Sequence, residues 1–297
     1  MDIILSSISQ GLLWSVMAIG VYLTFRILDI ADMTAEGSYP LGAAVCATGI
    51  VNGVNPLLAT FMAMLAGMGA GLISGLLHTK LKIPALLTGI VTLTGLYSIN
   101  LKILGKANVA LLKQETLVTQ LQDFSLTKTN AVLVIGLVFV LAVVGLLTLL
   151  FNTQIGLAIR STGDNIPMSE ANGINVDNMK IYGYMMSNGL IALCGALLTQ
   201  NNGYADLNSG TGTIVIGLAS VIIAEVILRN LRLGLRLLSV VLGAVVYRLI
   251  ILAILEIPGM DADLVKLFSA ILLATVLYVP ELQKKLNIRR PNLNGNA

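Results

Sequence analysis

Charged residues are scarce in this chain. Only 11% of its 297 residues are Asp, Glu, Lys or Arg, whereas 56% are hydrophobic. A soluble domain carries about a quarter charged residues, so the composition excludes an ordinary water-soluble fold. With a mean hydropathy of +0.89, most of the surface is expected to face lipid.

Residues that support metal, redox and acid–base chemistry are also few. The sequence has one histidine and two cysteines. Cys46 and Cys194 fall within apolar runs and lack metal or redox spacing, so we interpret them as small apolar residues. The acidic residues are scattered along the chain, which disfavours a membrane-embedded enzyme. We therefore expect neither a metal site nor a catalytic site.

A phosphate-binding loop is missing as well. No GxxxxGKS/T pattern occurs, because Gly105 and Lys106 lack both the upstream glycine and the following hydroxyl residue. The chain is therefore expected to bind no cofactor of its own and not to hydrolyse ATP alone. The net charge of +3 is spread over predicted loops and gives no argument for nucleic-acid binding.

Continuous apolar runs recur along the whole chain. A hydrocarbon core about 30 Å thick requires roughly 20 apolar residues in a helix. Continuous rather than alternating runs predict helices instead of barrel strands. We expect an all-α integral membrane protein, a polytopic bundle of about nine (eight to ten) transmembrane helices within a single domain over 1–297. The predicted spans lie near 8–28, 34–52, 57–78, 84–101, 131–151, 180–200, 212–229, 234–255 and 262–280.

The basic residues predict how these spans are oriented, since Lys and Arg favour cytoplasmic ends. With the N-terminus outside, twelve basic residues fall at cytoplasmic ends and five in outer loops, while Arg248 lies within a span. We therefore expect a multi-pass protein of the cell membrane with an outer N-terminus and a cytoplasmic C-terminus.

Charged residues gather where the first two predicted spans meet, in FRILDIADMTAEGSYPLG. One interpretation is a simple cytosolic turn in which Asp32 or Thr34 caps the next helix. The other is a broken helix that enters the bundle beside a transport pathway. Charged, irregular backbone at membrane depth needs surrounding protein or a water-filled cavity. Both interpretations of Asp32–Glu36 remain open from the residues alone.

Two charged residues in later spans also need partners. Glu225 lies one turn before Arg229, which predicts an i,i+4 ion pair. Arg248 has two interpretations. Its side chain either extends toward the outer face and meets Glu256 or Asp206, or it faces the interior and attracts a carboxylate-bearing solute.

A polar stretch over 152–180, NTQIGLAIRSTGDNIPMSEANGINVDNMK, interrupts the apolar pattern. Asp164 is a suitable N-cap, Pro167 suits a first helical turn, and Gly173 is placed to end the helix in the left-handed conformation. These signals predict a helix of about two turns. So short a helix is marginal alone, so its flanking spans or a partner must hold it. The alternative is a surface loop that contains one helical turn.

This stretch resembles the cytosolic loop of the permease family that includes bacterial branched-chain amino-acid and ribose ABC importers. In that family a Gly-x-Ala-x-Arg run precedes a small helix that ends before Gly-Ile-Asn. The matching positions here are Gly156, Ala158, Arg160, Glu170, Ala171, Gly173, Ile174 and Asn175. The early run GLLWSVMAIGVYLTFRILDIADMTAEGSYPLGA is similar to the family's first span and following turn, and the similarity covers nearly the whole chain.

The resemblance implies a transmembrane subunit of an ABC importer that works as a pair. As a compact permease with few charges in its spans, the chain resembles the branch of the family linked to aromatic amino acids, which would make the pair a homodimer. A coupling helix, here Asn165–Asn172, would insert into a separate ATPase subunit that binds ATP and Mg, and an external substrate-binding protein would deliver the solute. The implied coupling residues are Arg160, Asp164, Pro167, Met168, Glu170, Ala171, Gly173 and Ile174. We predict that the translocation route follows Ile30–Gly42 and includes Asp32, Glu36, Ser38, Tyr184, Asn188 and Arg248.

Other classes of protein compete with this interpretation. The main alternative is a secondary transporter or channel driven by an ion gradient, which places broken half-helices or ionisable groups in both halves of an inverted repeat. The sequence offers one candidate, around Asp32–Glu36, and no clear counterpart in the second half. A membrane enzyme and a scaffold subunit are further alternatives. Within the family the solute is an amino acid, a sugar or a nucleoside.

Overall fold

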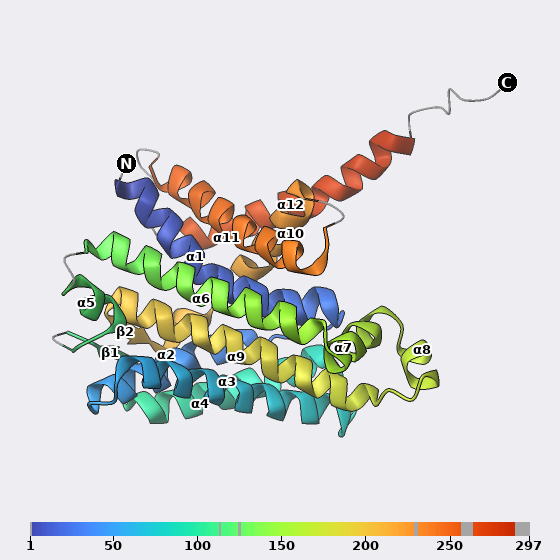
Figure 1. The fold of residues 1–297 in the computed structure, drawn as a ribbon, viewed down its shortest axis with the longest axis horizontal. Coiled ribbons are helices and arrows are strands. Elements are labelled where there is room, and N and C mark those ends of the chain that lie inside the picture. The colour runs from blue at the N-terminus through green and yellow to red at the C-terminus, as the bar shows by residue number, and fades with distance from the viewer. Residues whose placement is uncertain (1, 113, 124–125, 229–230, 257–263, 289–297) are drawn as a thin grey trace.

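The chain forms a bundle of long helices (Figure 1). The computed structural model describes residues 2–112, 114–123, 126–228, 231–256 and 264–288. The helices of the first half are α1 (Asp2–Tyr22) with its π-helical extension η1 (Leu23–Ile27), α2 (Ala35–Val51), α3 (Pro56–Thr79), α4 (Ala85–Leu104), α5 (Leu117–Gln122) and α6 (Lys128–Phe151). Those of the second half are α7 (Gln154–Asp164), α8 (Ile166–Ala171), α9 (Val176–Asn202), η2 (Leu207–Gly210), α10 (Thr213–Ile227), α11 (Leu233–Leu255) and α12 (Val265–Ile288).

Seven helical segments of the described chain are long and apolar enough to cross a membrane. They are Ile3–Ile27, Pro56–Thr79, Ala85–Leu104, Lys128–Phe151, Val176–Asn202, Leu207–Ile227 and Leu233–Leu255. The predicted spans 34–52 and 262–280 correspond to α2, which has 17 residues, and to α12, whose apolar part is Leu267–Tyr278. The all-α, polytopic class is therefore confirmed, but the count of nine spans is not.

Helix α9 occupies the centre of the bundle and is the most buried of these segments, with 78% of its apolar window inside the protein. Glycines let its neighbours approach closely. Gly67 and Gly71 of α3 lie against the backbone of Asn188 and Tyr184 and leave no room for a Cβ. These two glycines of α3 thus serve helix packing within the chain.

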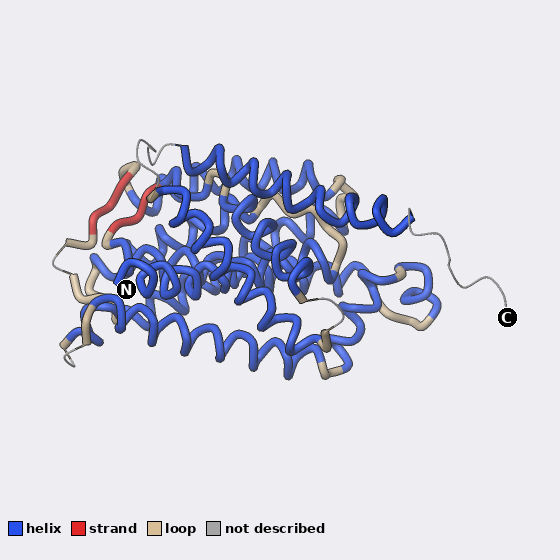
Figure 2. Tube along the Cα trace, turned by 90° about the horizontal axis from the view of Figure 1, so that it is seen from above, coloured by secondary structure: helices blue, strands red, loops and turns tan. Residues whose placement is uncertain are grey.

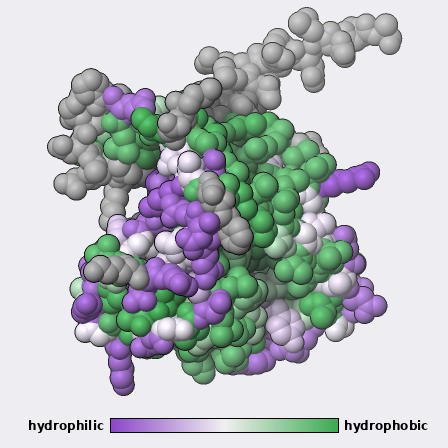
Figure 3. Space-filling model, turned by 60° about the vertical axis from the view of Figure 1, so that its left-hand side comes forward, coloured by the Kyte–Doolittle hydropathy of each residue, from purple (hydrophilic) through white to green (hydrophobic). Residues whose placement is uncertain are grey.

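The two ends of the bundle differ in structure (Figures 1 and 2). At one end lie the N-terminal part of α1, α5 and two short antiparallel strands, β1 (Asn108–Ala110) and β2 (Tyr204–Asp206), in which Val109 faces Ala205. At the other end lie α7 and α8. Figure 3, which turns the strand end forward, shows a hydrophilic cluster beside a broad hydrophobic flank, as expected where a lipid-facing wall meets an aqueous surface.

Two helices begin inside the bundle instead of at its ends. Helix α10 has 15 residues and starts at Thr213. Glu225, twelve residues later, pairs with Arg26 at the α7–α8 end, so the start of α10 lies about 18 Å from that end at 1.5 Å per residue. The start of α2 meets it there, because Glu36 Oε1 accepts a hydrogen bond from Gly212 N at 3.0 Å.

Candidate functional site

The polar stretch forms two short helices that extend beyond the bundle (Figure 1). Helix α7 is capped by Thr153, whose hydroxyl accepts from Gly156 N at 3.3 Å. Helix α8 is capped by Asn165, whose Oδ1 accepts from Met168 N at 3.0 Å. At the far end, Asn172 Nδ2 donates to Met168 O at 2.7 Å. The helix predicted over Asn165–Asn172 is therefore present as α8 with these two asparagines as its flanks.

The start of α8 differs from the prediction by one residue. Asp164 is the last residue of α7, so its assignment as N-cap is wrong. Asn165 takes the extended conformation that a cap requires, with φ of −157°, because the helical pattern of α7 continues through Asp164. Pro167 lies in the first turn and Gly173 has φ of +77°. Both of these positions are confirmed.

Most of the predicted coupling residues are exposed. Met168 is 50% exposed and Ile166 is 39% exposed. The side chains of Arg160, Asp164, Pro167, Glu170 and Ala171 are exposed too, whereas Ile174 is half-buried. Ser169 faces inward and donates to Asn165 O at 3.0 Å. Helix α8 thus presents apolar side chains outward on a surface that the described part of the chain does not cover.

Two glycines fix α7 against the bundle. Gly156 lies on the backbone of Leu150 and Phe151, at the end of α6, and Gly163 lies on the carbonyl of Ile27, at the end of η1. Neither position leaves room for a Cβ. The next residue, Leu28, also packs against Gly183 of α9. Helix α7 is therefore packed closely against the end of α6 and against η1.

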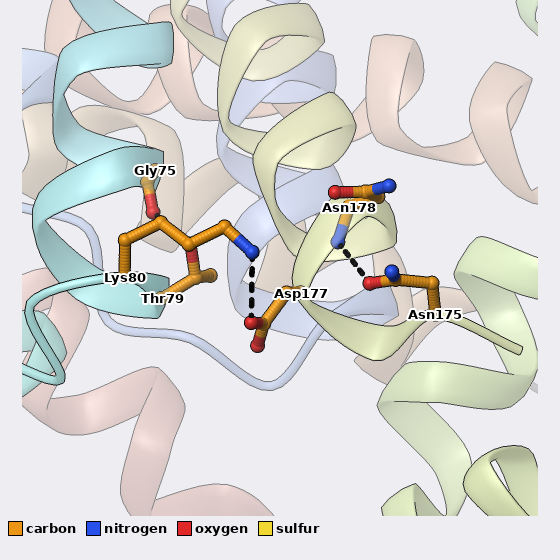
Figure 4. A network of polar contacts seen from close by, with 6 residues as sticks. All are labelled: Gly75, Thr79, Lys80, Asn175, Asp177 and Asn178. Carbon is orange, nitrogen blue, oxygen red and sulfur yellow. Dashed lines mark hydrogen bonds and ion pairs between the residues drawn. The ribbon is translucent and has the colours of Figure 1, made fainter.

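The base of α9 is tied to the end of α3, as Figure 4 shows. Lys80 Nζ lies 3.2 Å from Asp177 Oδ2, in the first turn of α9. Asn175 caps the same turn, with its Oδ1 accepting from Asn178 N at 3.1 Å. The side chains of the ion pair are about half exposed (53% and 47%), so it contributes little stability, about 0–1 kcal/mol, and mainly orients the helix start.

Three of the predicted pathway residues meet in a buried polar cluster. Asn188 Nδ2 donates to Asp32 Oδ2 at 2.8 Å, and Ser38 Oγ donates to Asn188 Oδ1 at 2.7 Å. The other oxygen of Asp32 accepts from Thr34 N at 2.9 Å. Asp32 is only 4% exposed, and Ser38 and Asn188 are fully buried. These bonds satisfy the carboxylate and the amide away from water.

The cluster shows where the segment Asp32–Glu36 lies, although Thr34 precedes α2 as the predicted cap. Asn188 lies twelve residues after the start of α9, about 18 Å along the helix. Because Asp32 bonds to it, the backbone after η1 enters the bundle and does not form a turn at the surface. Asp29, with φ of +55°, makes the reversal in the left-handed region that Asp tolerates better than most residues.

Tyr184 lies one turn below Asn188 and is completely buried. Its carbonyl accepts from Asn188 Nδ2 at 3.0 Å, and its ring is tilted against His78 with the ring centres 5.9 Å apart. The hydroxyl group of Tyr184 has no hydrogen-bond partner in the described part of the chain. Tyr184 therefore extends the buried cluster toward the C-terminal end of α3, where His78 lies.

Arg248 lies apart from this cluster. Its guanidinium donates to Gln10 Oε1 of α1, so the expected partners Glu256 and Asp206 are not the ones the structure shows. It borders a cavity of about 500 Å³ that Asn201 also lines. Asn201 is 13 residues beyond Asn188 on α9, about 20 Å further toward the strand end. Gln10, one helical turn from Trp14 on α1, offered no signal in the sequence.

Glu225 pairs with arginines from two other helices. Its Oε1 lies 2.7 Å from Arg26 Nε and 3.5 Å from an Arg236 nitrogen, so α10 is joined to η1 and α11. Arg229, the predicted partner, lies outside the described residues. η1 and the start of α11 bring these two arginines to the carboxylate.

The sequence predicted a span over 212–229, and α10 begins at Thr213, but its start inside the bundle was not predicted. The run LNSGTGT forms η2 and a glycine turn at Gly212, with φ of +82°, before an apolar helix. Together with the start of α2, this turn gives the bundle a second helix that begins in its interior. Two glycines ahead of an apolar run are the only local signal for it.

The seven apolar helical segments of the described chain, together with the polar helices α7 and α8 at one end, indicate a multi-pass membrane protein. The family described as "Branched-chain amino acid transport system / permease component" matches residues 3–277. The chain belongs to this family, and the resemblance inferred from the sequence is confirmed.

Two of the three relatives described here are named as transport permeases. The chain is 39% identical to the tyrosine transport system permease protein of Clostridioides difficile over 98% of this chain and 97% of that protein. It is 33% identical to an uncharacterised protein of Rickettsia prowazekii, over 77% and 79% of the two chains. It is 28% identical to the autoinducer 2 import system permease protein LsrC of Yersinia enterocolitica, over 75% and 59%. No solved structure matches the chain.

Proposed function

We propose that this chain is the transmembrane subunit of an ATP-driven ABC importer that moves a small solute across the membrane. The observation that carries the proposal is α8: a capped helix with exposed apolar side chains, fixed to the bundle through α7. A lipid-embedded pore has little need of such a helix. A permease that a separate ATPase must drive does need one.

In this proposal α8 is the coupling helix and inserts into a groove of the ATPase subunit. Met168 and Pro167 supply the apolar contact, and Ala171 lets the surfaces approach. Glu170, Arg160 and Asp164 supply charges around it. Gly173 and Ile174 close the helix and return the chain to α9. ATP and Mg belong to the ATPase subunit.

The chain of contacts from α8 to the buried cluster supports this role. Gly163 joins α7 to η1, Leu28 joins η1 to α9, and the segment that follows reaches Asp32. Closure of the ATPase subunits around nucleotide would move α8 and shift the bundle between two arrangements, because the nucleotide binds the two states differently.

The pathway proposal follows the same segment. Asp32, Ser38, Asn188 and Tyr184 are packed together in the structure, and Glu36 lies where α2 and α10 begin. Movement of the segment would open this centre to a solute. Arg248, near the strand end, would act earlier on the route, at the entry side.

The partners and orientation of the chain belong to the proposal as well. A second copy would complete the translocation route as a homodimer, and an external binding protein would deliver the solute. The chain would act as a single domain over 1–297, with the N-terminus outside and the C-terminus in the cytoplasm. Among the described side chains, the α7–α8 end gathers Arg26, Lys80, Lys82, Arg160, Lys180, Arg232 and Arg236, which supports a cytoplasmic location for it.

The solute in this proposal is an amino acid, best an aromatic one. The name of the tyrosine transport permease, similar over nearly the full length of both chains, supports this choice. The external binding protein selects the solute in such systems, so the permease needs only a weak site of its own. The alternative, a transporter driven by an ion gradient, gains support from the second interrupted helix but leaves α8 without a role.

The test is association with the ATPase subunit. Gly173→Val forces a β-branched residue into the left-handed region, and Glu170→Lys reverses a charge on the exposed face. Both variants are expected to reach the membrane normally and to lose most of their co-purification with the ATPase. Ser161→Ala, which removes only a bond within α7, is the control. Unchanged pull-down in both variants would show that α8 does not couple.

A further inference from the structure

The polar cavity beside Arg248 lies at the strand end of the bundle and has a volume of about 500 Å³. Residues of α1, α6, α9, α11 and β2 line it. Asn201, near the end of the central helix α9, is only 7% exposed, whereas Lys128 and Tyr204 are exposed. The cavity therefore connects the surface of this end with the top of the most buried helix.

Two cations line this cavity, Arg248 from α11 and Lys128 at the start of α6. None of the lining residues in the described structure is acidic. Neither cation has an ion-pair partner among the described residues. The N-terminus of α6 adds the positive end of a helix dipole. The electrostatic character of the cavity is therefore positive, which favours an anionic ligand.

Arg248 is the most informative of these residues because of its depth. It lies 15 residues after the start of α11 and 7 before its end, about 22 and 10 Å from the two ends of the helix. A charged group at such a depth is costly and needs a partner or a function. Its guanidinium donates to Gln10 Oε1, which is a neutral acceptor and does not balance the charge. The planar fork of an arginine matches the two oxygens of a carboxylate.

The surroundings of Arg248 differ on its two sides. The polar cavity offers oxygens of Ser9, Thr129 and Asn202, which can accept protons from an ammonium group. Arg248 also lines a second cavity of about 420 Å³, whose walls are mostly apolar and include Ile3, Ile251, Leu252 and Leu255. A zwitterion with an apolar side group uses both kinds of wall. A phosphodiester has no protons to donate to the polar oxygens, so a lipid headgroup fits the polar cavity less well.

We propose that the polar cavity is an entry subsite that binds the carboxylate of an amino acid with an apolar or aromatic side group. The Arg248 guanidinium binds the carboxylate oxygens, Lys128 adds attraction from the exposed rim, and the side group lies against the apolar walls. The proposal rests on the proposed transport function and adds to it the group of the solute that the permease itself recognises.

The experiment measures binding by calorimetry to the permease–ATPase complex in nanodiscs, without the delivery protein. Three matched probes separate the groups of the ligand: L-phenylalanine, 3-phenylpropionate, which lacks the amine, and phenethylamine, which lacks the carboxylate. We expect the first two to bind, and phenethylamine to bind at least about tenfold more weakly than 3-phenylpropionate, a difference of about 1.4 kcal/mol. Equal binding of these last two probes would overturn the proposal.

Variants locate the site. Arg248→Gln should weaken 3-phenylpropionate binding about tenfold or more, and Arg248→Lys, which keeps the charge but not the fork, should weaken it less. Lys128→Gln should weaken binding several-fold, and since Lys128 is exposed, this variant tests the proposal even where Arg248→Gln fails to assemble. Lys106→Gln is the matched control, because Lys106 is an exposed cation before β1 that lines neither cavity. It should leave binding unchanged.

A phospholipid headgroup is the other source of an anion at this end, and native mass spectrometry of the complex distinguishes it. We expect the wild-type protein and Arg248→Gln to retain the same phospholipids. A phospholipid that only the wild type retains, together with no binding of 3-phenylpropionate, would assign the cavity to a lipid headgroup and overturn the solute subsite.

Failure of the subsite and failure of the proposed function are distinguishable. Unchanged binding of 3-phenylpropionate in both Arg248→Gln and Lys128→Gln overturns the subsite, even if ATP-driven uptake by the wild-type complex is intact. Absence of ATP-driven uptake by the wild-type complex with its delivery protein overturns the proposed function instead, and the binding data then judge the carboxylate site independently.

Discussion

At the residue scale, Asn188 connects segments that are distant in sequence. Its amide joins Ser38 and Asp32, 150 and 156 positions away. Burial of a carboxylate away from water costs free energy, which a hydrogen bond from such a donor offsets. If the donor is removed, the full desolvation cost remains. Asn188 therefore holds the irregular segment before α2 inside the bundle, and the geometry of the proposed pathway depends on it.

Replacement of Asn188 by leucine tests this role. Asn188→Leu should lower the stability of the purified protein by about 2–4 kcal/mol, because a buried charged acceptor and a hydroxyl lose their partner. Thermal unfolding in detergent measures the change. Asn178→Leu, at an exposed position of the same helix, is the matched control and should shift the midpoint little. Equal shifts in both variants would contradict the role of the cluster.

At the element scale, α7 connects the exposed helix α8 to the bundle. Gly163 lies on the carbonyl of Ile27, so any side chain there must push η1 away. The contact needs no conformational freedom of glycine, only its lack of a Cβ.

Substitution of Gly163 should therefore separate binding from transport. Gly163→Ala leaves α8 exposed, so co-purification with the ATPase should persist, while ATP-driven uptake should fall several-fold. Gly145→Ala in α6, where an added Cβ meets nothing within 4 Å, should leave both properties unchanged. Uptake at the wild-type rate in Gly163→Ala would show that force does not pass through this contact.

Local sequence signals predicted the long apolar helices and the small helix over Asn165–Asn172, since both depend on residues that are neighbours in the chain. Other features depend on contacts between distant residues. The bond from Asp32 to Asn188, the pairing of Glu225 with Arg26 and the bond from Arg248 to Gln10 have no local signature. The position of the start of α10 inside the bundle was not predicted for the same reason, because a glycine-rich turn inside a bundle resembles a surface loop in sequence.

At the scale of the whole molecule, the proposed direction of transport requires α8 to face the cytoplasm. Cysteine labelling measures this directly, because Cys46 and Cys194 are both completely buried and give little background. Met168→Cys on α8 should react with an impermeant maleimide only after the membrane is opened. Asn208→Cys, at an exposed position beside the strand end, should react in intact cells. The reverse labelling pattern would show that the topology is opposite to the proposed one.

Dependence of solute movement on the ATPase subunit is the most direct test of the central claim that α8 transmits force into the bundle. The measurement is uptake of a radiolabelled amino acid into proteoliposomes that contain the permease and its external binding protein, with and without the ATPase. Uptake should occur only with both the ATPase and ATP, and should disappear in Gly173→Val. Uptake at the full rate without the ATPase would contradict the account.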